Sequence, residues 1–462
     1  MAAVTVQARA AHLLVDTIQD MGRMIRMSDE LFEKAPVGRA YFKMALPVVF
    51  SMVVSLVYNM VDTFFIARTQ NTSLVAGVSL CAPIFTMMIA LGDIFGLGGS
   101  SVISRLFGEG KDEEGKRVSG FCFYAAILCG VVVAVLMLLF QGPVLTLLGA
   151  DGDTRVFASQ YYVYMAIGAP FVIVSLTPSN LMRTEGLALE SMIATVTGSV
   201  VNIILDPVFI FGLDMGAAGA AIATVLGNVA ADILLVYYVR KKSRKLTVSC
   251  RDIRVGGSVT GAILAIGIPA SITNIMQSFG ITLANRSLVR YGTDKVASMG
   301  IAMKVGMIVV LVMVGFAFGA QPLLGYNYGA KNEKRLKEIL RFDLLVEFTF
   351  SIVTASLLAL FAPQIVRIFM KEEAIVSAGS LMLRCLVMSS PFIGVVLVFT
   401  TLFQAEGRAL PALILSVSRQ GVIYAACLFA LSLAFGYHGV ICAQAAADVL
   451  TAAVAVFLYK KR

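Results

Sequence analysis

Residues 95–113 read FGLGGSSVISRLFGEGKDE, and residues 316–333 read FAFGAQPLLGYNYGAKNE. The positions that match at one offset of 221 residues are Phe95 with Phe316, Gly98 with Gly319, Gly108 with Gly329, Phe140 with Phe361, Pro170-Phe171 with Pro391-Phe392, and Glu185-Gly186 with Glu406-Gly407. A repeat of this length is a whole bundle of elements rather than one unit of a solenoid. The chain is therefore predicted to consist of two similar halves.

The composition indicates that both halves lie in a membrane. The 462 residues are 58% hydrophobic and only 14% charged, which leaves too little polar surface for a soluble protein of this size. The seven cysteines form no CxxC pair, and most lie in apolar segments. We interpret them as small core residues rather than as disulfides or metal ligands.

Twelve apolar segments are long enough to cross a bilayer, since a spanning helix needs about 20 residues. They lie near residues 41–66, 74–105, 118–140, 157–182, 190–212, 217–239, 260–289, 295–326, 338–361, 377–403, 410–435 and 437–459. Several exceed the required length, so we expect them to tilt, protrude or break at glycine.

Lys and Arg are concentrated in alternate links between these segments. The basic stretches are Arg240-Lys-Lys-Ser-Arg-Lys245, Lys460-Lys461-Arg462, and the links that carry Lys111, Lys116, Arg117, Lys331, Lys334 and Arg335. With twelve spans all of them lie on one side, which predicts that both termini are cytoplasmic. Topology and anionic lipid headgroups then explain the net charge of +9 without any role in nucleic-acid binding.

Six spans per half is an even number, so both halves enter the membrane from the same side. We therefore expect an all-α integral membrane fold of two six-helix bundles, related by a pseudo-twofold axis along the membrane normal. The predicted parts are an N-terminal extension (1–36), an N-terminal lobe (37–240), a cytoplasmic linker (241–258) and a C-terminal lobe (259–462). Membrane repeats of this kind are typical of secondary transporters, which bind substrate at the repeat interface.

The first 36 residues contain acidic and basic residues and no uninterrupted apolar core, so they do not form a signal peptide. Residues 11–26 have some amphipathic character, which suits a helix on the inner leaflet. The alternatives are a disordered tail, or translation that starts at Met24 or Met27.

Two aspartates inside predicted spans are candidates for function, because intramembrane charge is costly. Asp62 lies 15 residues beyond Pro47 in the first span, or roughly 22 Å along a helix. Asp206 lies in the fifth span, where Asn202 shares its helix face. Pro207 loosens that helix, and freed carbonyls beside a carboxylate suit a proton or a small hard cation.

Two interpretations of this acidic pair stay open. Desolvation and a nearby second carboxylate both favour the neutral form of a carboxyl group, so Asp62 and Asp206 are suited to exchange protons near physiological pH. Alternatively, Asp206 and Asn202 only satisfy a kinked helix, while Asp62 sits at the aqueous edge. The repeat-related positions are close to Ala284 and Ala426-Cys427, which cannot titrate usefully, and this asymmetry favours the functional interpretation.

From residue 36 to the end, the chain resembles the multidrug and toxic compound extrusion (MATE) family, in its DinF-like branch. The most specific segments are Tyr58-Asn-Met-Val-Asp-Thr63, Asn202-Ile-Ile-Leu-Asp-Pro207 and Gly319-Ala-Gln-Pro-Leu-Leu-Gly-Tyr-Asn-Tyr-Gly-Ala330. The resemblance implies rocker-switch efflux of varied, often cationic, amphipathic compounds in exchange for inward H⁺ or Na⁺. It also implies that Asp62, Asn202 and Asp206 form the ion site, with Thr224 as a hydroxyl ligand.

Further polar and soft residues are candidates for the substrate cavity, although packing and interhelical hydrogen bonding explain each of them equally simply. These candidates are Tyr58, Asn59, Asp93, Asn274, Met276, Gln277, Met303 and Lys304. Asp93 either faces the cavity or pairs with a neighbour. Lys304 either selects charge or extends its ammonium group to the interface. Asp232 and Asp448 recur in matching Ala-Ala-Asp contexts, for which we expect a structural or gating role.

An enzyme is not expected, because the chain has two histidines and no nucleophile motif, phosphate-binding loop or metal cluster. No cofactor is expected besides the coupling ion, and we expect a monomer in the cytoplasmic (inner) membrane. Alternative functions are a lipid-linked-oligosaccharide flippase, a solute importer of similar architecture, or a channel or structural membrane protein. Neither the substrate nor the choice between H⁺ and Na⁺ follows from these residues.

Overall fold

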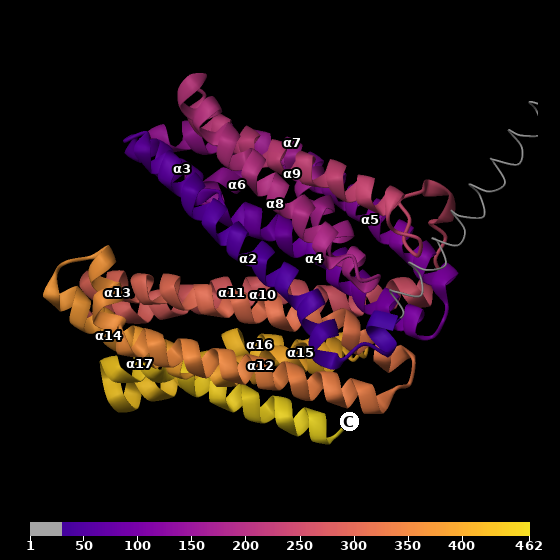
Figure 1. Ribbon diagram of the computed structural model, residues 1–462. Coiled ribbons are helices and arrows are strands. Elements are labelled where there is room, and N and C mark those ends of the chain that lie inside the picture. Colours follow the sequence, from indigo (N-terminus) through magenta and orange to yellow (C-terminus); the bar gives the residue numbers. More distant parts are fainter. Residues whose placement is uncertain (1–29) are drawn as a thin grey trace, which may run out of the picture.

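A computed structural model describes residues 30–462, apart from the side chains of Asp252, Ile275 and Thr293. The chain forms two bundles of helices, the N-terminal and C-terminal lobes, which together make a V (Figure 1). The lobes meet at one end, where the basic links lie, and diverge towards the other end. We call these the basic end and the wide end.

Apolar runs become long helices because a helix satisfies its own backbone hydrogen bonds where no water is present. In the N-terminal lobe the elements are α2 (Val37–Arg68), α3 (Thr72–Leu80), α4 (Ala82–Gly108), α5 (Asp112–Leu139), α6 (Gln141–Leu147), α7 (Gly152–Thr184), α8 (Ala188–Pro207), η1 (Val208–Gly212) and α9 (Gly216–Lys241). After Pro207 helix α8 continues as the π-helical turn η1, which agrees with the expected loosening of the helix at that proline.

The connection between the lobes contains one short helical turn, η2 (Cys250–Asp252). In the C-terminal lobe the elements are α10 (Gly257–Leu288), η3 (Val289–Tyr291), α11 (Thr293–Gly329), α12 (Glu333–Leu360), α13 (Ala362–Phe369), α14 (Glu373–Met388), α15 (Ser390–Ala405), α16 (Ala409–Val417), η4 (Ser418–Val422) and α17 (Ile423–Lys460). A π-helical turn, η4, thus interrupts the eleventh predicted span, whereas η1 ends the fifth.

The described residues contain ten helical stretches long and apolar enough to cross a membrane, and α14 with α15 makes an eleventh that is bent by 41°. One stretch, Ala409–Lys460, has 52 residues and holds two spans. Gly436 breaks it with a φ of 56°, and Glu406 before it pairs with Arg462 after it at 2.9 Å. Both of its ends therefore lie at the basic end, so this stretch crosses and returns. The prediction of twelve spans in two bundles is confirmed.

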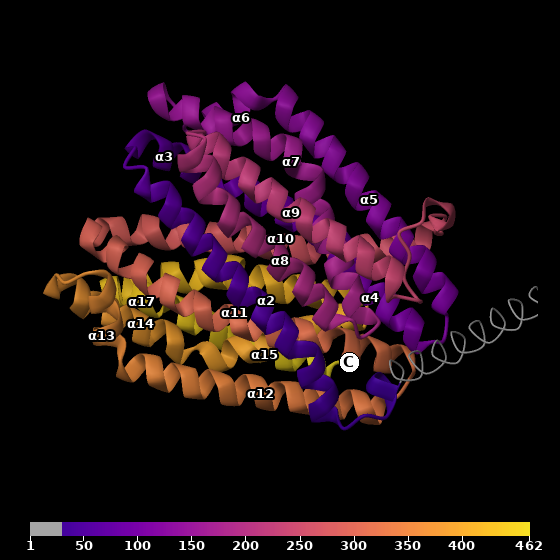
Figure 2. The same ribbon diagram turned by 45° about the horizontal axis from the view of Figure 1, so that its top comes forward.

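Several helix pairs join the lobes, and two of these pairs are related by the repeat. Helix α4 packs against α10, and helix α11 packs against α2 (Figure 2). A Cβ atom at Gly98 of α4 would lie 2.3 Å from the Ile263 carbonyl oxygen, and one at Gly319 of α11 would lie 2.3 Å from the Ala45 Cα atom. The matched glycines therefore allow backbone-to-backbone contact between the lobes.

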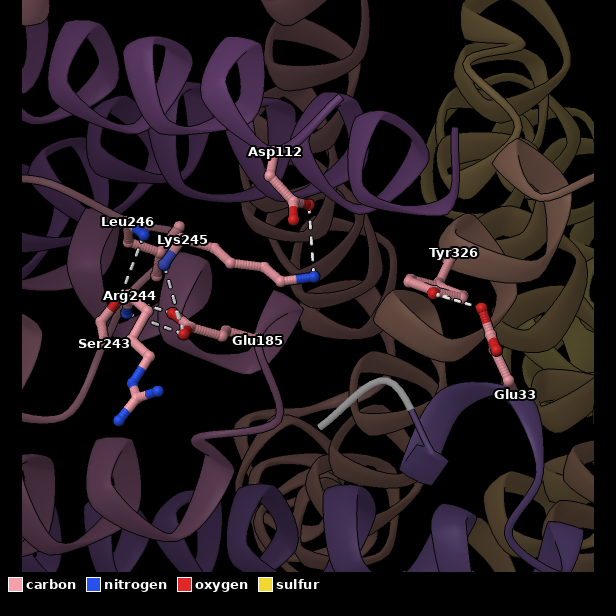
Figure 3. A network of polar contacts seen from close by, with 8 residues as sticks. All are labelled: Glu33, Asp112, Glu185, Ser243, Arg244, Lys245, Leu246 and Tyr326. Atoms are coloured by element: carbon pink, nitrogen blue, oxygen red, sulfur yellow. Dashed lines mark hydrogen bonds and ion pairs between the residues drawn. The ribbon is translucent and has the colours of Figure 1, made fainter. Parts of the chain in front are cut away.

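At the basic end Glu185, which follows α7, holds the linker (Figure 3). Its carboxylate accepts hydrogen bonds from the Arg244 amide (2.8 Å), the Lys245 amide (3.3 Å) and the Ser243 hydroxyl. Burial raises the pKa of Glu185, and these three hydrogen bonds oppose that shift. The Lys245 ammonium in turn pairs with Asp112 of α5 at 3.2 Å. The linker is therefore anchored to the N-terminal lobe.

Residues 31–35 pack on the other lobe. The Arg335 guanidinium of α12 donates to the carbonyls of Phe32 and Ala35, each at 2.6 Å. Figure 3 shows the Tyr326 hydroxyl of α11, which donates to Glu33 at 2.9 Å. This part of the predicted extension is thus attached to the C-terminal lobe. The expectations for residues 11–26, and for starts at Met24 or Met27, lie outside the described residues.

Candidate functional site

The two predicted aspartates meet inside the N-terminal lobe. Asp62 lies on α2 and Asp206 lies at the end of α8, and their carboxyl groups are within hydrogen-bonding reach of each other. Asp206 is fully buried, and Asp62 is partly buried. Sequence proximity did not bring them together, since α2 and α8 are the first and fifth spans.

Asn202 and Thr224 complete this cluster. The Asn202 amide, one turn before Asp206 on α8, lies 3.5 Å from the Asp206 carboxylate and 3.4 Å from the Thr224 hydroxyl of α9. Three buried oxygen atoms, one each from Asp62, Asn202 and Asp206, have no hydrogen-bond partner. Buried polar atoms are normally satisfied, so the N-terminal acidic site (Asp62, Asn202, Asp206 and Thr224) is fitted to hold a proton or a small cation.

A cavity of about 190 Å³ adjoins the N-terminal acidic site. Tyr58 and Asn59 of α2 line it together with Asn202 and Thr224, so these four predicted residues share one chamber. Tyr161 of α7 lies near Asp62, Tyr58 and Asp206 and was not predicted. The sequence does not single out Tyr161 as a site residue, because tyrosine is common in membrane helices.

A second cavity, of about 330 Å³, lies in the C-terminal lobe. Three predicted residues line it: Gln277 of α10, and Met303 and Lys304 of α11. Asp448 of α17 and Arg419 of η4 also line it, and they pair at 2.9 Å. Arg419 was not predicted, although an arginine in an apolar span should have raised the question.

Three other predicted residues lie outside both cavities. The Asp93 carboxyl group of α4 lies within hydrogen-bonding reach of Asn274 of α10 and near the Arg183 guanidinium of α7. These neighbours suit the pairing interpretation of Asp93, and the contact between α4 and α10 joins the two lobes. Met276 packs its sulfur atom towards Gly421 of η4. A cavity role for Asp93, Asn274 and Met276 stays a prediction.

Two buried acids escaped the sequence analysis. Asp343 and Glu347 lie in the ninth predicted span, in the stretch RFDLLVEFTF, and both are buried. The rule that singled out Asp62 and Asp206 applies to them equally. The C-terminal lobe therefore does contain buried acids, although the positions that the repeat relates to Asp62 and Asp206 cannot titrate usefully.

Twelve spans in two related lobes, with a cavity in each lobe and a buried acidic site beside one of them, define a secondary membrane transporter. The chain belongs to the MATE family, since the family model described as MatE matches residues 47–208 and 269–452. This result confirms the family resemblance, and with it a transport protein rather than an enzyme. The DinF-like branch stays a prediction.

Relatives match over nearly the whole chain. The chain is 32% identical over 435 residues to the multidrug export protein MepA of Staphylococcus aureus strain NCTC 8325, covering 94% of this chain and 96% of the relative. It is 30% identical over the same shares to MepA of Staphylococcus saprophyticus. A solved outward-facing multidrug resistance MATE family transporter superimposes with a TM-score of 0.88 at 25% identity, covering 94% of this chain and 97% of that one.

Proposed function

We propose that this protein exports chemically varied, often cationic, amphipathic compounds in exchange for inward H⁺ or Na⁺. The observation that carries the proposal is the group of three unpartnered buried oxygen atoms on Asp62, Asn202 and Asp206. Relatives that are named multidrug export proteins support the export of several compounds. The adjoining cavity, with Tyr58 and Asn59 in its wall, is the proposed entry to the ion site.

The proposed orientation has the basic end in the cytoplasm of a cell whose inner membrane holds the protein as a monomer. Positive charge on the links supports this assignment. The lobes diverge at the wide end, so the conformation in Figure 1 is then open to the outside. Similarity to an outward-facing transporter agrees with this proposal.

The exchange works through helix α2 in this proposal. Two charged carboxylates on Asp62 and Asp206 repel α2 from α8, and a bound proton or cation removes that repulsion. Pro47 lies within α2, where it removes a backbone hydrogen bond and allows the helix to bend. The contact of Ala45 with Gly319 of α11 lies near this bend, so a movement of α2 reaches the contact between the lobes.

The lining of the N-terminal cavity favours export of cations over flipping of lipid-linked oligosaccharides. A pyrophosphate group needs basic partners, and the residues that line the N-terminal cavity include neither Lys nor Arg. A cation is suited to the neighbouring carboxylates instead.

The test is dye export by the full chain in everted vesicles, with Na⁺ varied at fixed pH and a pH gradient varied at fixed Na⁺. We expect Asp62→Asn and Asp206→Asn each to lower ion-driven transport at least about tenfold. The control is Asp153→Asn, because Asp153 is an exposed acid of the same lobe. Undiminished transport in both site variants would refute the proposed exchange, and dependence on one ion alone would identify it.

A further inference from the structure

Helix α12 carries a buried polar stripe on one face. Asp343, Glu347 and Ser351 are spaced by four residues, and each is at most 1% exposed. Counted from the start of α12 at Glu333, Asp343 lies about 15 Å along the helix from the basic end, given a rise of 1.5 Å per residue. Two acidic side chains are therefore held deep in the C-terminal lobe.

The pair faces the other lobe. The Tyr41 hydroxyl of α2 donates a hydrogen bond to Asp343 Oδ1 at 2.7 Å, and Tyr41 is itself fully buried. Aromatic rings surround this contact: the Tyr41 ring lies 5.2 Å from the Phe342 ring and 6.4 Å from the Phe316 ring, which lies 5.6 Å from Phe350. The surroundings therefore have low polarity, and they include a helix of each lobe.

The acids lack the partners that buried charges need. Asp343 Oδ2 and both carboxylate oxygens of Glu347 are buried without a well-formed hydrogen bond, and the group that lies beside the Glu347 carboxylate is the uncharged backbone of Ala317 on α11. No ion pair found among residues 30–462 includes Asp343 or Glu347, and those residues hold no cluster of three metal-ligating side chains.

The packed helices offer no compensating charge. Residues 305–325 of α11 and all of α15 contain no titratable side chain. On α14, Arg384 donates to the Ala359 carbonyl and Glu373 pairs with Arg367. On α2 the titratable group that faces the pair is Tyr41, since Arg39 and Lys43 are exposed.

Two negative charges cannot stay adjacent, desolvated and without a cation, because each costs several kcal/mol even after relaxation. The group that removes both problems without needing further ligands is a proton. We propose that Asp343 and Glu347 form a second proton-binding site, which holds at least one proton while the lobes are closed at the basic end and releases it when α2 parts from α12.

The sign of the effect follows from burial. With the basic end closed the pair is dry, and the neutral form is favoured. When the lobes separate there, water reaches both carboxyl groups and stabilises their charged forms. Raising the pH therefore favours opening of the basic end, and lowering the pH favours closure. This inference rests on the alternating opening of the lobes in the proposed function, but it does not depend on the residues of the N-terminal acidic site.

A first experiment detects the proton directly, by the infrared carbonyl stretch of protonated carboxyl groups in the purified full chain near neutral pH. Glu347→Gln, or Asp343→Asn, is expected to remove part of that absorption. The matched control is Glu338→Gln, the same change at an exposed position of the same helix. Unchanged absorption in both site variants would overturn the proposal.

A second experiment measures the distance between spin labels at the basic end. The labels are placed at Glu113→Cys and Lys334→Cys, two exposed positions on different lobes, with the exposed cysteines replaced by Cys250→Ser and Cys442→Ser. For one released proton the ratio of open to closed molecules rises by up to about tenfold per pH unit.

Glu347→Gln should flatten this pH response, whereas Glu338→Gln should retain it. A full response in folded Glu347→Gln would overturn the proposal. Because Asp62→Asn and Asp206→Asn leave α12 intact, loss of transport in those variants tests the N-terminal acidic site alone.

Discussion

The two lobes share a scaffold and differ in how they hold acid. In the N-terminal lobe Asp62 and Asp206 come from two helices and lie beside an amide, a hydroxyl and a cavity. In the C-terminal lobe Asp343 and Glu347 come from one helix and lie among aromatic rings against the other lobe. The two halves share the glycines at the lobe contacts, whereas these four acids stand at positions that the repeat does not relate.

The largest expected effect is the loss of dye export when the acidic pair of the N-terminal lobe is changed rather than the acidic pair of the C-terminal lobe. Asp206→Asn should lower ion-driven dye export at least about tenfold, because a site that loses one charged ligand loses on the order of 1.4 kcal/mol or more. Glu347→Gln should instead change the pH response of lobe opening. Equal loss of export in both variants, with no change in conformation, would remove the distinction between the lobes.

The acids at Asp448 and Asp232 sharpen the comparison, because they recur in matching contexts. Asp448 accepts from Arg419, Ser389 and Gln444 at 2.8–3.1 Å, whereas both oxygens of Asp232 are buried without a partner. Asp448→Asn should destabilise the protein by about 2–4 kcal/mol, since it leaves Arg419 unpaired.

The same substitution at Asp232 should change stability by less than about 1 kcal/mol. Thermal unfolding of both variants in detergent gives the comparison. A greater loss of stability at Asp232 than at Asp448 would contradict the assignment of partners.

The glycine contacts test what the lobes still share. Gly98→Ala and Gly319→Ala should each cost about 1–3 kcal/mol, because the new Cβ atom meets backbone of the other lobe. Gly300→Ala on α11 is the control, since nothing lies within 4 Å of a Cβ atom there. The melting temperatures of the three variants would be compared. A smaller loss of stability in Gly98→Ala or Gly319→Ala than in Gly300→Ala would contradict the idea that both lobes share this glycine contact.

The smallest effect concerns the anchored linker. The pKa of Glu185 lies above its ordinary value in the folded protein because of burial. The folded state then binds the proton more tightly, so the stability that Glu185 contributes grows as pH falls through the raised pKa and fades as pH rises. As the pH falls from neutral towards the ordinary pKa range of glutamate, the stability of the wild type should therefore increase relative to that of Glu185→Gln.

Melting curves at several pH values would check this prediction, with the exposed Glu113→Gln as the control. A gain of wild type over Glu185→Gln as pH rises would contradict it.

Much of the fold could be predicted from the sequence, because a membrane helix is defined by a local property, its apolar length. The twelve spans and the repeat needed no long-range information. Contacts between helices were harder. The meeting of Asp62 with Asp206 followed from family resemblance, and that of Asp93 with Asn274 was not predicted, because one sequence does not say which helices are neighbours.

Asp343 and Glu347 were not predicted for a different reason. Their spacing of four residues on a single helix was visible, and the rule on intramembrane charge applied to them. Only acids of the N-terminal lobe were compared with their repeat-related positions. Acids of the C-terminal lobe without a repeat-related acid were therefore missed.

The crossed packing of α2 on α11 and of α10 on α4 has a consequence for the symmetry of the molecule. A single half, present in two copies around the same axis, would make both contacts at once, because each copy offers the glycine face of one helix and receives the other. The geometry is that of a symmetric homodimer whose two subunits are connected, here by residues 242–256, into one polypeptide.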